Sequence, residues 1–514
     1  MANPKQDSLF ELIKSLTKSE KRHFRMFVNR SGNSEDVKFV KLFDAMDCLK
    51  SYDDKVILGK VKSIKKEQFS NQKANLFKQI LASLRHFHIS HNTDMQLRES
   101  LDHAKLLYNK GFYRQALKIL DRAKTQAKDT KHHALALLIM EFEKMIESQH
   151  ITRSIESRAG ELTNEVNQTS QILLSTHQLS NLTLNLYSLF LQKGYAKNET
   201  DFNEVSAYFK ANFPSVELSS LSFYEQMYYH QSHVWYNNIV QNFPNSYKHS
   251  RALVDLFKQN EDMINKQTAL FIKSYSNLLT ALFQLQYYSA FCEVLSEVED
   301  LSKDKSIVKD LNTEVLIFKF LWVSKINKAF MEGNFEEGTQ MVPKLLKKLS
   351  EYEGKIDPER VLLFYYKIAT LYFGCGNNRK AIFYLNKIVY FKDVSLREDI
   401  HCFARILNLI AHFEDGQDFH LEYQIKSTFH FIGKMNDQQA VQKEIFNFLR
   451  KTGKIKPDEL KQEFQILYDR LAVLNENLYE RRPFLYLDIL SWLKSKIENR
   501  PVQEVVQEKF KTLK

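Results

Sequence analysis

The chain has 514 residues and contains only 13 glycines and 8 prolines, while 44% of its residues are hydrophobic and 26% are charged. Such a scarcity of turn-forming residues excludes a β-rich fold of this length, and the balance of apolar and charged residues excludes a disordered chain. The net charge is +11, and residues 1–91 alone hold 18 Lys and Arg against 10 Asp and Glu, so the positive charge is concentrated at the N-terminus.

The sequence predicts a cytoplasmic protein. Its first residues lack the apolar core of a secretion signal, and no apolar stretch approaches the roughly 18 residues that a membrane-spanning helix needs. Four widely spaced cysteines, without a CxxC pair, are expected to be buried free thiols in a reducing compartment: Cys48, Cys292, Cys375 and Cys402.

Residues 1–91 are predicted to form a small basic helical domain. Thr17 and Glu20 have the spacing of a capping box, in which each side chain bonds the backbone N–H of the other residue at a helix start. The helix that they open places Phe24, Phe27 and Val28 on one face. Further helices are expected over residues 35–50, 53–62 and 70–90, and the polar stretch His91 to Asp94 marks the end of the domain.

The second half of this domain carries a cluster of basic residues with few acids between them. Two interpretations remain open: a solvated basic face, or a patch that contacts nucleic acid or an acidic protein. The helix over 66–90 lacks a clear helix-turn-helix signature. The residues of the predicted anion-binding patch are Lys60, Lys62, Lys65, Lys66, Lys73, Lys78 and Arg85.

A repeated pattern of small residues begins after residue 95. In residues 101–123 Ala104 is followed by Gly111 and Ala116, and in residues 365–389 Ala369 is followed at the same spacing by Gly376 and Ala381. Small residues let two antiparallel helices approach closely, and a glycine between them ends the first helix in a left-handed conformation. A weaker copy over 326–342 has Ala329, Gly333 and Gly338.

This pattern resembles the tetratricopeptide repeat, a pair of antiparallel helices that stacks on its neighbours. The chain is similar to long bacterial proteins of this kind that carry a short basic helical domain before the repeats. Anchor residues equivalent to Ala104 recur every 40–47 residues, a longer step than the roughly 34 of a standard repeat. The predicted anchors are Ala104, Met145, Tyr187, Ser232, Leu279, Ile326, Ala369 and Leu409.

The resemblance implies an all-α fold in which helix pairs form a right-handed superhelical solenoid over residues 95–455. Residues 456–514 depart from the pattern. Pro457 and Pro483 are suited to helix starts, and Leu487, Leu490, Trp492 and Ile497 are candidate core residues. We expect residues 456–514 to cap the last repeat.

The resemblance also implies that the first helix of each pair lines a concave groove. The position four residues after an anchor is aromatic in five repeats, and aromatic rings suit the binding of a peptide. The alternative is that these rings belong to the core between repeats. The predicted groove residues are Tyr108, Asn109, His233, Tyr236, Asn237, Phe283, Gln284, Asn327, Phe330 and Phe373, with Arg98 and Lys105 near the first repeat.

Motifs that carry catalysis are missing from the sequence, which has no phosphate-binding glycine loop, no GxSxG and no HExxH. The histidines His86, His88 and His91 have poor spacing for a shared metal, so we predict no metal, no cofactor and no small-molecule substrate. The leading hypothesis is a non-enzymatic scaffold that binds a peptide or protein in its groove. The alternative is a DNA-binding regulator whose basic domain contacts DNA while the repeats sense a partner.

Overall fold

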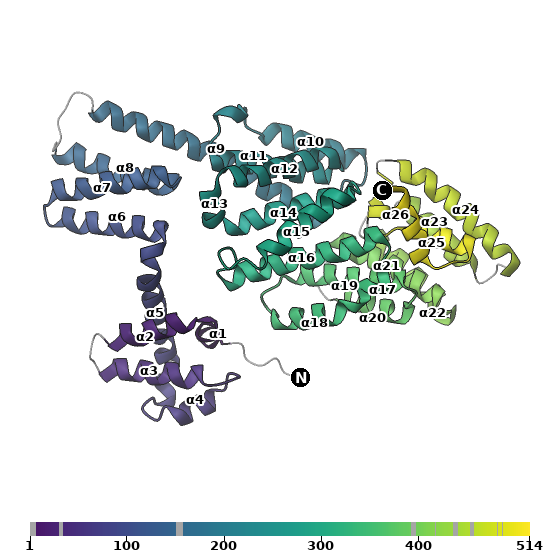
Figure 1. Cartoon of the computed structure of the whole chain (residues 1–514), viewed down its shortest axis with the longest axis horizontal. Coiled ribbons are helices and arrows are strands. Elements are labelled where there is room, and N and C mark those ends of the chain that lie inside the picture. Colours follow the sequence, from purple (N-terminus) through teal and green to yellow (C-terminus); the bar gives the residue numbers. More distant parts are fainter. Residues whose placement is uncertain are drawn as a thin grey trace. The chain divides into compact units, whose positions relative to one another are not determined.

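The computed structural model describes residues 7–29, 34–150, 158–391, 397–416, 418–434, 440–452, 457–477, 479–480, 482–485 and 487–513. Throughout these residues the structure is built from helices and contains no strand, which confirms the predicted all-α class (Figure 1). The chain divides into two compact units, Met1–Leu173 and Leu174–Lys514, here called the first and second units. The three domains expected from the sequence remain predictions.

The first unit begins with a group of helices that share one hydrophobic core, built around Phe24, Phe43, Ile57 and Leu76. The predicted helices are confirmed with small shifts at their ends. The helices of this group are α1 (Ser8–Ser15), α2 (Lys18–Asn29), α3 (Ser34–Asp47), α4 (Asp54–Lys60) and α5 (Phe69–His88).

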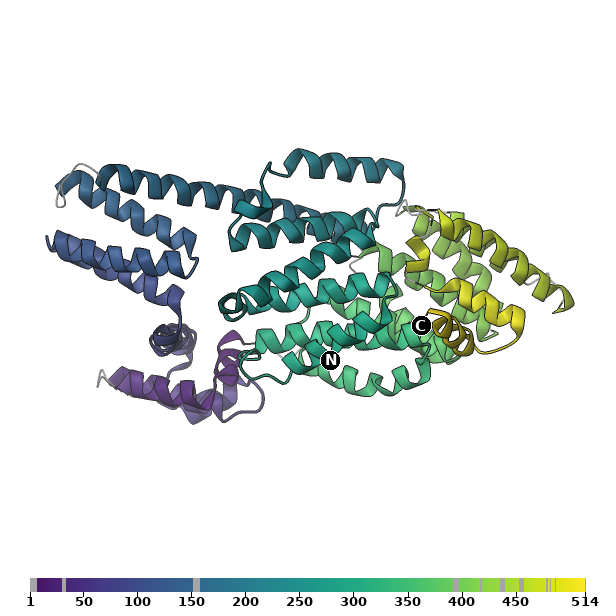
Figure 2. The ribbon, with the colours of Figure 1, turned by 45° about the horizontal axis from the view of Figure 1, so that its top comes forward.

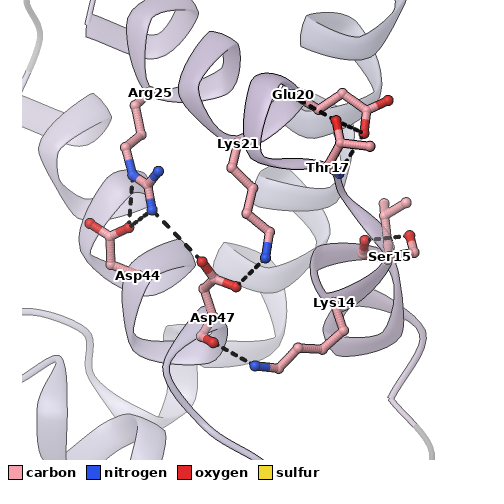
Figure 3. A network of polar contacts seen from close by, with 9 residues as sticks. Lys14, Ser15, Thr17, Glu20, Lys21, Arg25, Asp44 and Asp47 are labelled. Atoms are coloured by element: carbon pink, nitrogen blue, oxygen red, sulfur yellow. Dashed lines mark hydrogen bonds and ion pairs between the residues drawn. The ribbon is translucent and has the colours of Figure 1, made fainter.

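The predicted capping box at the start of α2 is confirmed. The backbone N–H of Thr17 donates to Glu20 Oε2 at 2.7 Å, and the backbone N–H of Glu20 donates to Thr17 Oγ1 at 3.2 Å. One turn further along, Lys21 and Arg25 reach across to two aspartates of α3, Asp47 and Asp44 (Figure 3). These ion pairs fix α2 beside α3 over the apolar core.

A second core in the first unit holds the first predicted repeat. It is formed by α6 (Thr93–Asn109), α7 (Tyr113–Asp129), α8 (His133–His150) and the start of α9 (Arg158–Lys193). Ala104 and Ala116 are fully buried where α6 meets α7, and Gly111 between them has a φ of +80°, a value that a side chain makes costly. The small residues therefore have the packing role that the sequence predicts.

The second unit contains the end of α9 and all the helices that follow. They are α10 (Glu199–Asn212), α11 (Phe223–Ile239), α12 (Phe243–Gln259), α13 (Glu261–Lys266), α14 (Thr268–Gln284), α15 (Tyr288–Leu301), α16 (Leu311–Glu332), α17 (Phe335–Gln340), α18 (Val342–Glu351), α19 (Pro358–Gly374), α20 (Asn378–Val389), α21 (Glu398–Glu414), α22 (Asp418–Lys434), α23 (Ala440–Thr452), α24 (Pro457–Glu476), α25 (Ile489–Glu498) and α26 (Val502–Leu513).

Neighbouring helices of the second unit pack in chain order. Helix α12 contacts α11 and α14, α14 contacts α15 and α16, and α19 contacts α17, α20 and α21. Figure 2 shows α11 to α21 as successive layers of helices. Sequential packing of this kind is compatible with a helical repeat fold, because each pair buries its apolar face only against its neighbours.

The predicted anchors all lie in the first helix of a pair, from α6 to α21. A left-handed residue follows the anchor by seven positions in six pairs, at Gly111, Gly194, Gln286, Gly333, Gly376 and Gly416. In α11 the left-handed residue is Gln241, nine positions after Ser232. The equivalent anchor is therefore Val234, and the predicted register is wrong by two residues in this pair.

Close approach of helices explains the weak third copy of the repeat. A Cβ atom at Gly338 would lie 2.5 Å from Leu371 Cδ2 of α19, and a Cβ atom at Gly374 would lie 2.5 Å from the Phe335 ring of α17. Only glycine fits at both positions without displacing a neighbour. The pair of glycines thus allows α17 and α19 to pack closely.

The C-terminal helices contact two different parts of the second unit. Trp492 of α25 is buried and donates from Nε1 to Glu414 Oε1 of α21 at 2.8 Å, as a cap on the last repeat would. Helix α26 instead reaches α16 and α17, where Gln503 Oε1 accepts from the backbone N–H of Glu336 at 3.0 Å. The contact of α26 with this earlier pair was not expected from the sequence.

None of the helices described is both long enough and apolar enough to cross a lipid bilayer. Cys48, Cys292 and Cys375 are free thiols, as expected, although Cys48 is exposed and the other two are half-buried.

Candidate functional site

The predicted groove residues of the first unit all lie on α6, and two of them contact α8. Tyr108 donates its hydroxyl to Gln149 Oε1 at 2.7 Å, and the Lys105 ammonium lies 5.2 Å from the centre of the Tyr108 ring and 5.1 Å from that of Phe142. Asn109 is exposed at the end of α6. Arg98 is exposed and pairs with Asp94 of its own helix at 2.7 Å, so its charge is already balanced.

The predicted basic patch falls into two groups. Lys60, Lys62, Lys65, Lys66 and Lys78 are exposed, and no carboxylate of the described residues lies within ion-pair distance of them. The other two are paired: Lys73 with Asp7, and Arg85 with Asp102 at 3.3 Å. Five of the seven residues are therefore free to meet an anion.

The predicted groove residues of α11 face α10. The Tyr236 ring stacks on Phe209 at 4.2 Å and its hydroxyl is 3.1 Å from Ser206 Oγ, while His233 contacts the Phe209 ring at 5.2 Å. The buried Asn237 amide donates to the carbonyl of His233 in the preceding turn. The two-residue register difference is the reason that these side chains do not occupy the same place as Phe283 and Phe330.

Two more predicted residues have internal roles. Phe373 is only 5% exposed and belongs to the large hydrophobic core that also contains residues of α20 and α21. Gln284 donates from Nε2 to the Tyr195 hydroxyl at 3.1 Å. Whether these positions bind a partner stays a prediction, but Phe373 offers almost no surface for contact.

The remaining three predicted residues, Phe283, Asn327 and Phe330, converge on one lysine. Lys367 of α19 donates from Nζ to Asn327 Oδ1 at 2.5 Å. Its ammonium lies 5.7 Å from the centre of the Phe283 ring and 5.2 Å from that of Phe330. Helices α14, α16 and α19 thus place a cation between two aromatic faces, an arrangement in which the ring quadrupoles attract the charge.

Two further cations, Lys273 and Arg360, lie on helices that form this site, α14 and α19. The Lys273 ammonium of α14 lies 4.7 Å from the centre of the Tyr187 ring and 5.7 Å from that of Trp235. The Arg360 guanidinium of α19 lies 5.8 Å from the centre of the Phe320 ring. We call Lys273, Arg360 and Lys367 the cationic cluster. All three side chains are half-buried.

Among the described residues, the cationic cluster has no ion-paired counter-charge. No carboxylate of the described residues lies within ion-pair distance of any of its three members. Two acids near the cluster, Asp357 and Asp399, each pair with a cation outside it. Asp357 is 3.4 Å from Lys319, and the buried Asp399 holds Arg397 through two hydrogen bonds of 2.8 and 2.9 Å. Among the described residues, the three cations of the cluster therefore have no ion-pair partner, whereas the other cations nearby, Lys319 and Arg397, each have one.

Burial is the main cause of the pKa shifts in the cluster, and the charge of Arg360 adds to it at both lysines. Burial, and then the charges of Arg360 and Arg397, lower the pKa of the Lys367 ammonium from 10.5 to about 7. Burial, followed by Arg360 and Lys319, also lowers the pKa of Lys273. Burial and the charge of Arg397 lower the pKa of Arg360, which still keeps its proton because guanidinium groups in proteins do not lose it.

A group of three histidines lies between α11 and α12. His230 Nδ1 is 3.0 Å from His249 Nδ1, and the His233 ring stacks on that of His249 at 4.2 Å. Burial first, and then neighbouring positive charge, lowers the pKa of His230 and His249 to about 4 and that of His233 to about 3. The three rings are therefore neutral near pH 7.

The histidines singled out in the sequence behave differently. His88 Nε2 lies 2.8 Å from Glu20 Oε1, and His86 stacks on His23 with 5.5 Å between ring centres. In the part of the chain that the structure describes, no three His, Cys, Asp or Glu side chains are grouped as metal ligands.

Reasoning from the sequence found the aromatic and amide residues around Lys367 but missed the three cations. The signal was present, because Lys273 and Lys367 each interrupt an apolar run, in LFIKSY and FYYKIAT. A lysine on the buried side of a helix is rare unless it has a partner. Comparison of the chain with protein-family models, with curated proteins and with solved structures gives no match in any of the three.

Proposed function

We propose that the protein is a non-enzymatic scaffold that binds a peptide segment or a protein partner. In this proposal the helix pairs form a tetratricopeptide-like superhelix, and the first helices of the pairs line its concave face. The observation that carries the proposal is the convergence of Phe283, Asn327 and Phe330 from two first helices on Lys367 of a third. Aromatic faces with a polar group between them are typical of peptide-binding surfaces.

Site-specific photo-crosslinking tests this function directly. A photoreactive phenylalanine analogue replaces Phe330, or Phe383 as the control. Phe383 lies on α20, a second helix, and is 57% exposed, so it is at least as accessible to proteins that collide at random. In native cells we expect one partner crosslinked at position 330 and absent at position 383. Equal products at the two positions, or none at position 330, would contradict the proposal.

Truncation then separates binding from folding. Phe330→Ala is expected to weaken binding of the captured partner by about 1 kcal/mol or more, as at interface hot spots. Tyr236→Ala serves as the contrast: because its ring stacks on Phe209, it is expected to lower the melting temperature and leave affinity nearly unchanged. Thermal melts and titrations on the same proteins give both numbers.

A DNA-binding regulator remains the second candidate, and one observation favours it. Lys60, Lys62, Lys65, Lys66 and Lys78 are exposed on α4, α5 and the segment between them, without carboxylate partners among the described residues. Exposed lysines in such a group attract phosphates and release counterions. Titration of the full chain with duplex DNA at rising salt tests this function.

A further inference from the structure

The cationic cluster is set among aromatic rings, where unpaired charge is costly. Tyr187 and Trp235 cover one side of Lys273, and Phe283 and Phe330 flank Lys367. Rings attract a cation but accept hydrogen bonds poorly, so they replace only part of the water that the cation loses. A cation kept in such a place without an internal partner is suited to an anion that arrives from outside.

Hydrogen-bond capacity at the cluster is also largely unused. An ammonium has three donors, and Lys367 uses one of them on Asn327 Oδ1. A guanidinium has five donors in a planar fork that fits a carboxylate, and the guanidinium of Arg360 forms no hydrogen bond with any described residue. The side chains therefore present free donors as well as positive charge.

The described acids near the cluster only partly offset its charge. Asp357 is held by Lys319 and Asp399 by Arg397. Asp357 and Glu359 raise the pKa of Arg360, but burial and Arg397 outweigh them. Among the described residues no carboxylate pairs with the cluster, so an anionic ligand is suited to supply the counter-charge.

The spacing of the cations indicates what kind of anion fits. Arg360 and Lys367 are seven residues apart on α19, which is about 10 Å along a helix. This is the distance along the helix axis between the two backbone positions, so the two long side chains can hold separate anionic groups. In an extended peptide, side chains two or three residues apart are about 7–10 Å from one another, so acidic residues at that separation match it.

We propose that the cationic cluster of Lys273, Arg360 and Lys367 binds the carboxylate side chains of an extended acidic peptide segment. This inference rests on the proposed peptide-binding function and specifies the chemistry of the partner. Arg360 and Lys367 of α19 hold two separate carboxylates. Lys273, which lies on α14, holds a third. Phe283 and Phe330 pack against the aliphatic part of the segment.

The test uses a fluorescent polyglutamate peptide whose ends are acetylated and amidated, so that only side chains carry charge. Anisotropy is measured with the full-length protein, and a polyglutamine peptide of the same length is the uncharged control. Glutamate is expected to bind at least about tenfold more tightly than glutamine. Lys367→Met and Arg360→Met are each expected to lower the affinity for the glutamate peptide about tenfold, because each variant loses a charge-assisted contact.

Lys380→Met is the matched control variant. Lys380 lies on α20, is exposed, and its ammonium is 5.1 Å from the centre of the Tyr372 ring, so this variant loses the same charge and a similar ring contact outside the cluster. Its affinity for the glutamate peptide is expected to stay within about twofold of the parent. If Lys380→Met weakens binding as much as Lys367→Met does, attraction by the overall charge explains the result and the proposal fails.

A second measurement does not depend on how well a variant folds. Since its pKa is lowered to about 7, the Lys367 amine is partly neutral at pH 7.5 and is expected to react faster with acetic anhydride than Lys380. A bound carboxylate stabilises the ammonium, so the glutamate peptide is expected to slow acetylation at Lys367 and not at Lys380. Mass spectrometry of the digested protein reports both sites. Unchanged acetylation at saturating peptide would overturn the proposal.

Other outcomes separate this inference from the function on which it rests. A phosphoserine peptide that binds while polyglutamate does not would overturn the carboxylate assignment. Crosslinking of a partner at Phe330 whose bound segment contains no acidic residues would do the same and leave the scaffold function standing. If polyglutamate binds at the cluster and Phe330 captures no partner, the acidic site stands and the scaffold function fails.

Discussion

The two units of the protein treat partly buried cations in opposite ways. In the first unit Lys124 and Arg158 both reach Glu143, whose carboxylate is fully buried, and Lys124 Nζ is 2.9 Å from Glu143 Oε2 and 3.2 Å from Glu165 Oε2. In the second unit Lys273, Arg360 and Lys367 have aromatic neighbours and, among the described residues, no acid within ion-pair distance.

This difference separates structural charges from charges available to a ligand. A buried pair is stable because each ion replaces the water lost by the other, and removal of one partner exposes the full desolvation cost. A cation without an internal partner already bears that cost in the free protein, so the fold gains nothing from it. The histidines between α11 and α12 show a third solution, because their lowered pKa values leave them uncharged near pH 7.

The strongest test of the comparison removes the shared carboxylate of the first unit. Glu143→Gln keeps the shape of the side chain but leaves Lys124 and Arg158 without its charge, and we expect the free energy of unfolding to fall by about 3–5 kcal/mol. Glu161→Gln is the control, because Glu161 is 56% exposed and lies 3.8 Å from the same Arg158. Urea denaturation that finds similar losses for the two variants would show that Glu143 is not the key partner.

A second test concerns the neutral histidines. The pKa of His230 is about 4 in the folded protein and 6.5 when unperturbed, so its contribution to stability is complete above pH 6.5 and is lost as the pH falls toward 4. His230→Gln is therefore expected to remove about 2 kcal/mol of the acid destabilisation between pH 7 and pH 5. His177→Gln, at an exposed position of α9, should leave the pH profile of the melting temperature unchanged. Parallel profiles for the parent and His230→Gln would contradict the assignment.

Lys367 provides the corresponding test in the cationic cluster. Its pKa is about 7 in the folded protein against 10.5 unperturbed, so between these values the unfolded chain binds more protons and stability rises with pH. We expect the parent to gain about 1 kcal/mol relative to Lys367→Met between pH 7 and pH 8. At pH 7 Lys367→Met should be at least as stable as the parent. A loss of several kcal/mol at pH 7 would mean that Lys367 is a structural residue, as the cations of the first unit are.

Sequence patterns predicted the helix pairs where a small residue is needed for close packing or for a left-handed turn. Ala104, Gly111 and Ala116 are required by close packing and a left-handed turn, and the structure has them there. At α11 the left-handed turn residue is Gln241, so no turn glycine marks the register there; at α14 the turn residue is likewise a glutamine, Gln286, and the expected spacing held. The Gln241 side chain donates from Nε2 to the carbonyl of Ala196 at 3.2 Å, a distant contact that local spacing does not reveal.

The candidate site was predictable only in part for a similar reason. Phe283, Asn327 and Phe330 follow the repeat register, so their common face could be inferred from spacing. The position of Lys367 between two rings depends on how α14, α16 and α19 pack, which the register does not specify. The docking of α26 on α16 likewise joins residues far apart in the chain.

The smallest effect on stability is expected at the exposed lysines of the first unit, where solvent already hydrates the charge. The combined replacement of Lys60, Lys62, Lys65 and Lys66 by Gln should change the free energy of unfolding by no more than about 0.5 kcal/mol. If the regulator function holds, the same variant loses affinity for duplex DNA. The slope of log affinity against log salt then becomes less steep by about 0.9 for each phosphate contact removed.

A charge-matched variant of the second unit controls for net charge in that experiment. It carries Gln at four exposed lysines: Lys248, Lys305, Lys344 and Lys347. Equal loss of DNA affinity in the two variants would show that the net charge of +11 attracts DNA without a specific patch. If only the variant of the first unit loses DNA affinity, the solvated lysines of that unit bind phosphates. The cluster around Lys367 would then bind a different anion. The two units would then differ in their ligands for the same reason that they differ in how their charges are paired.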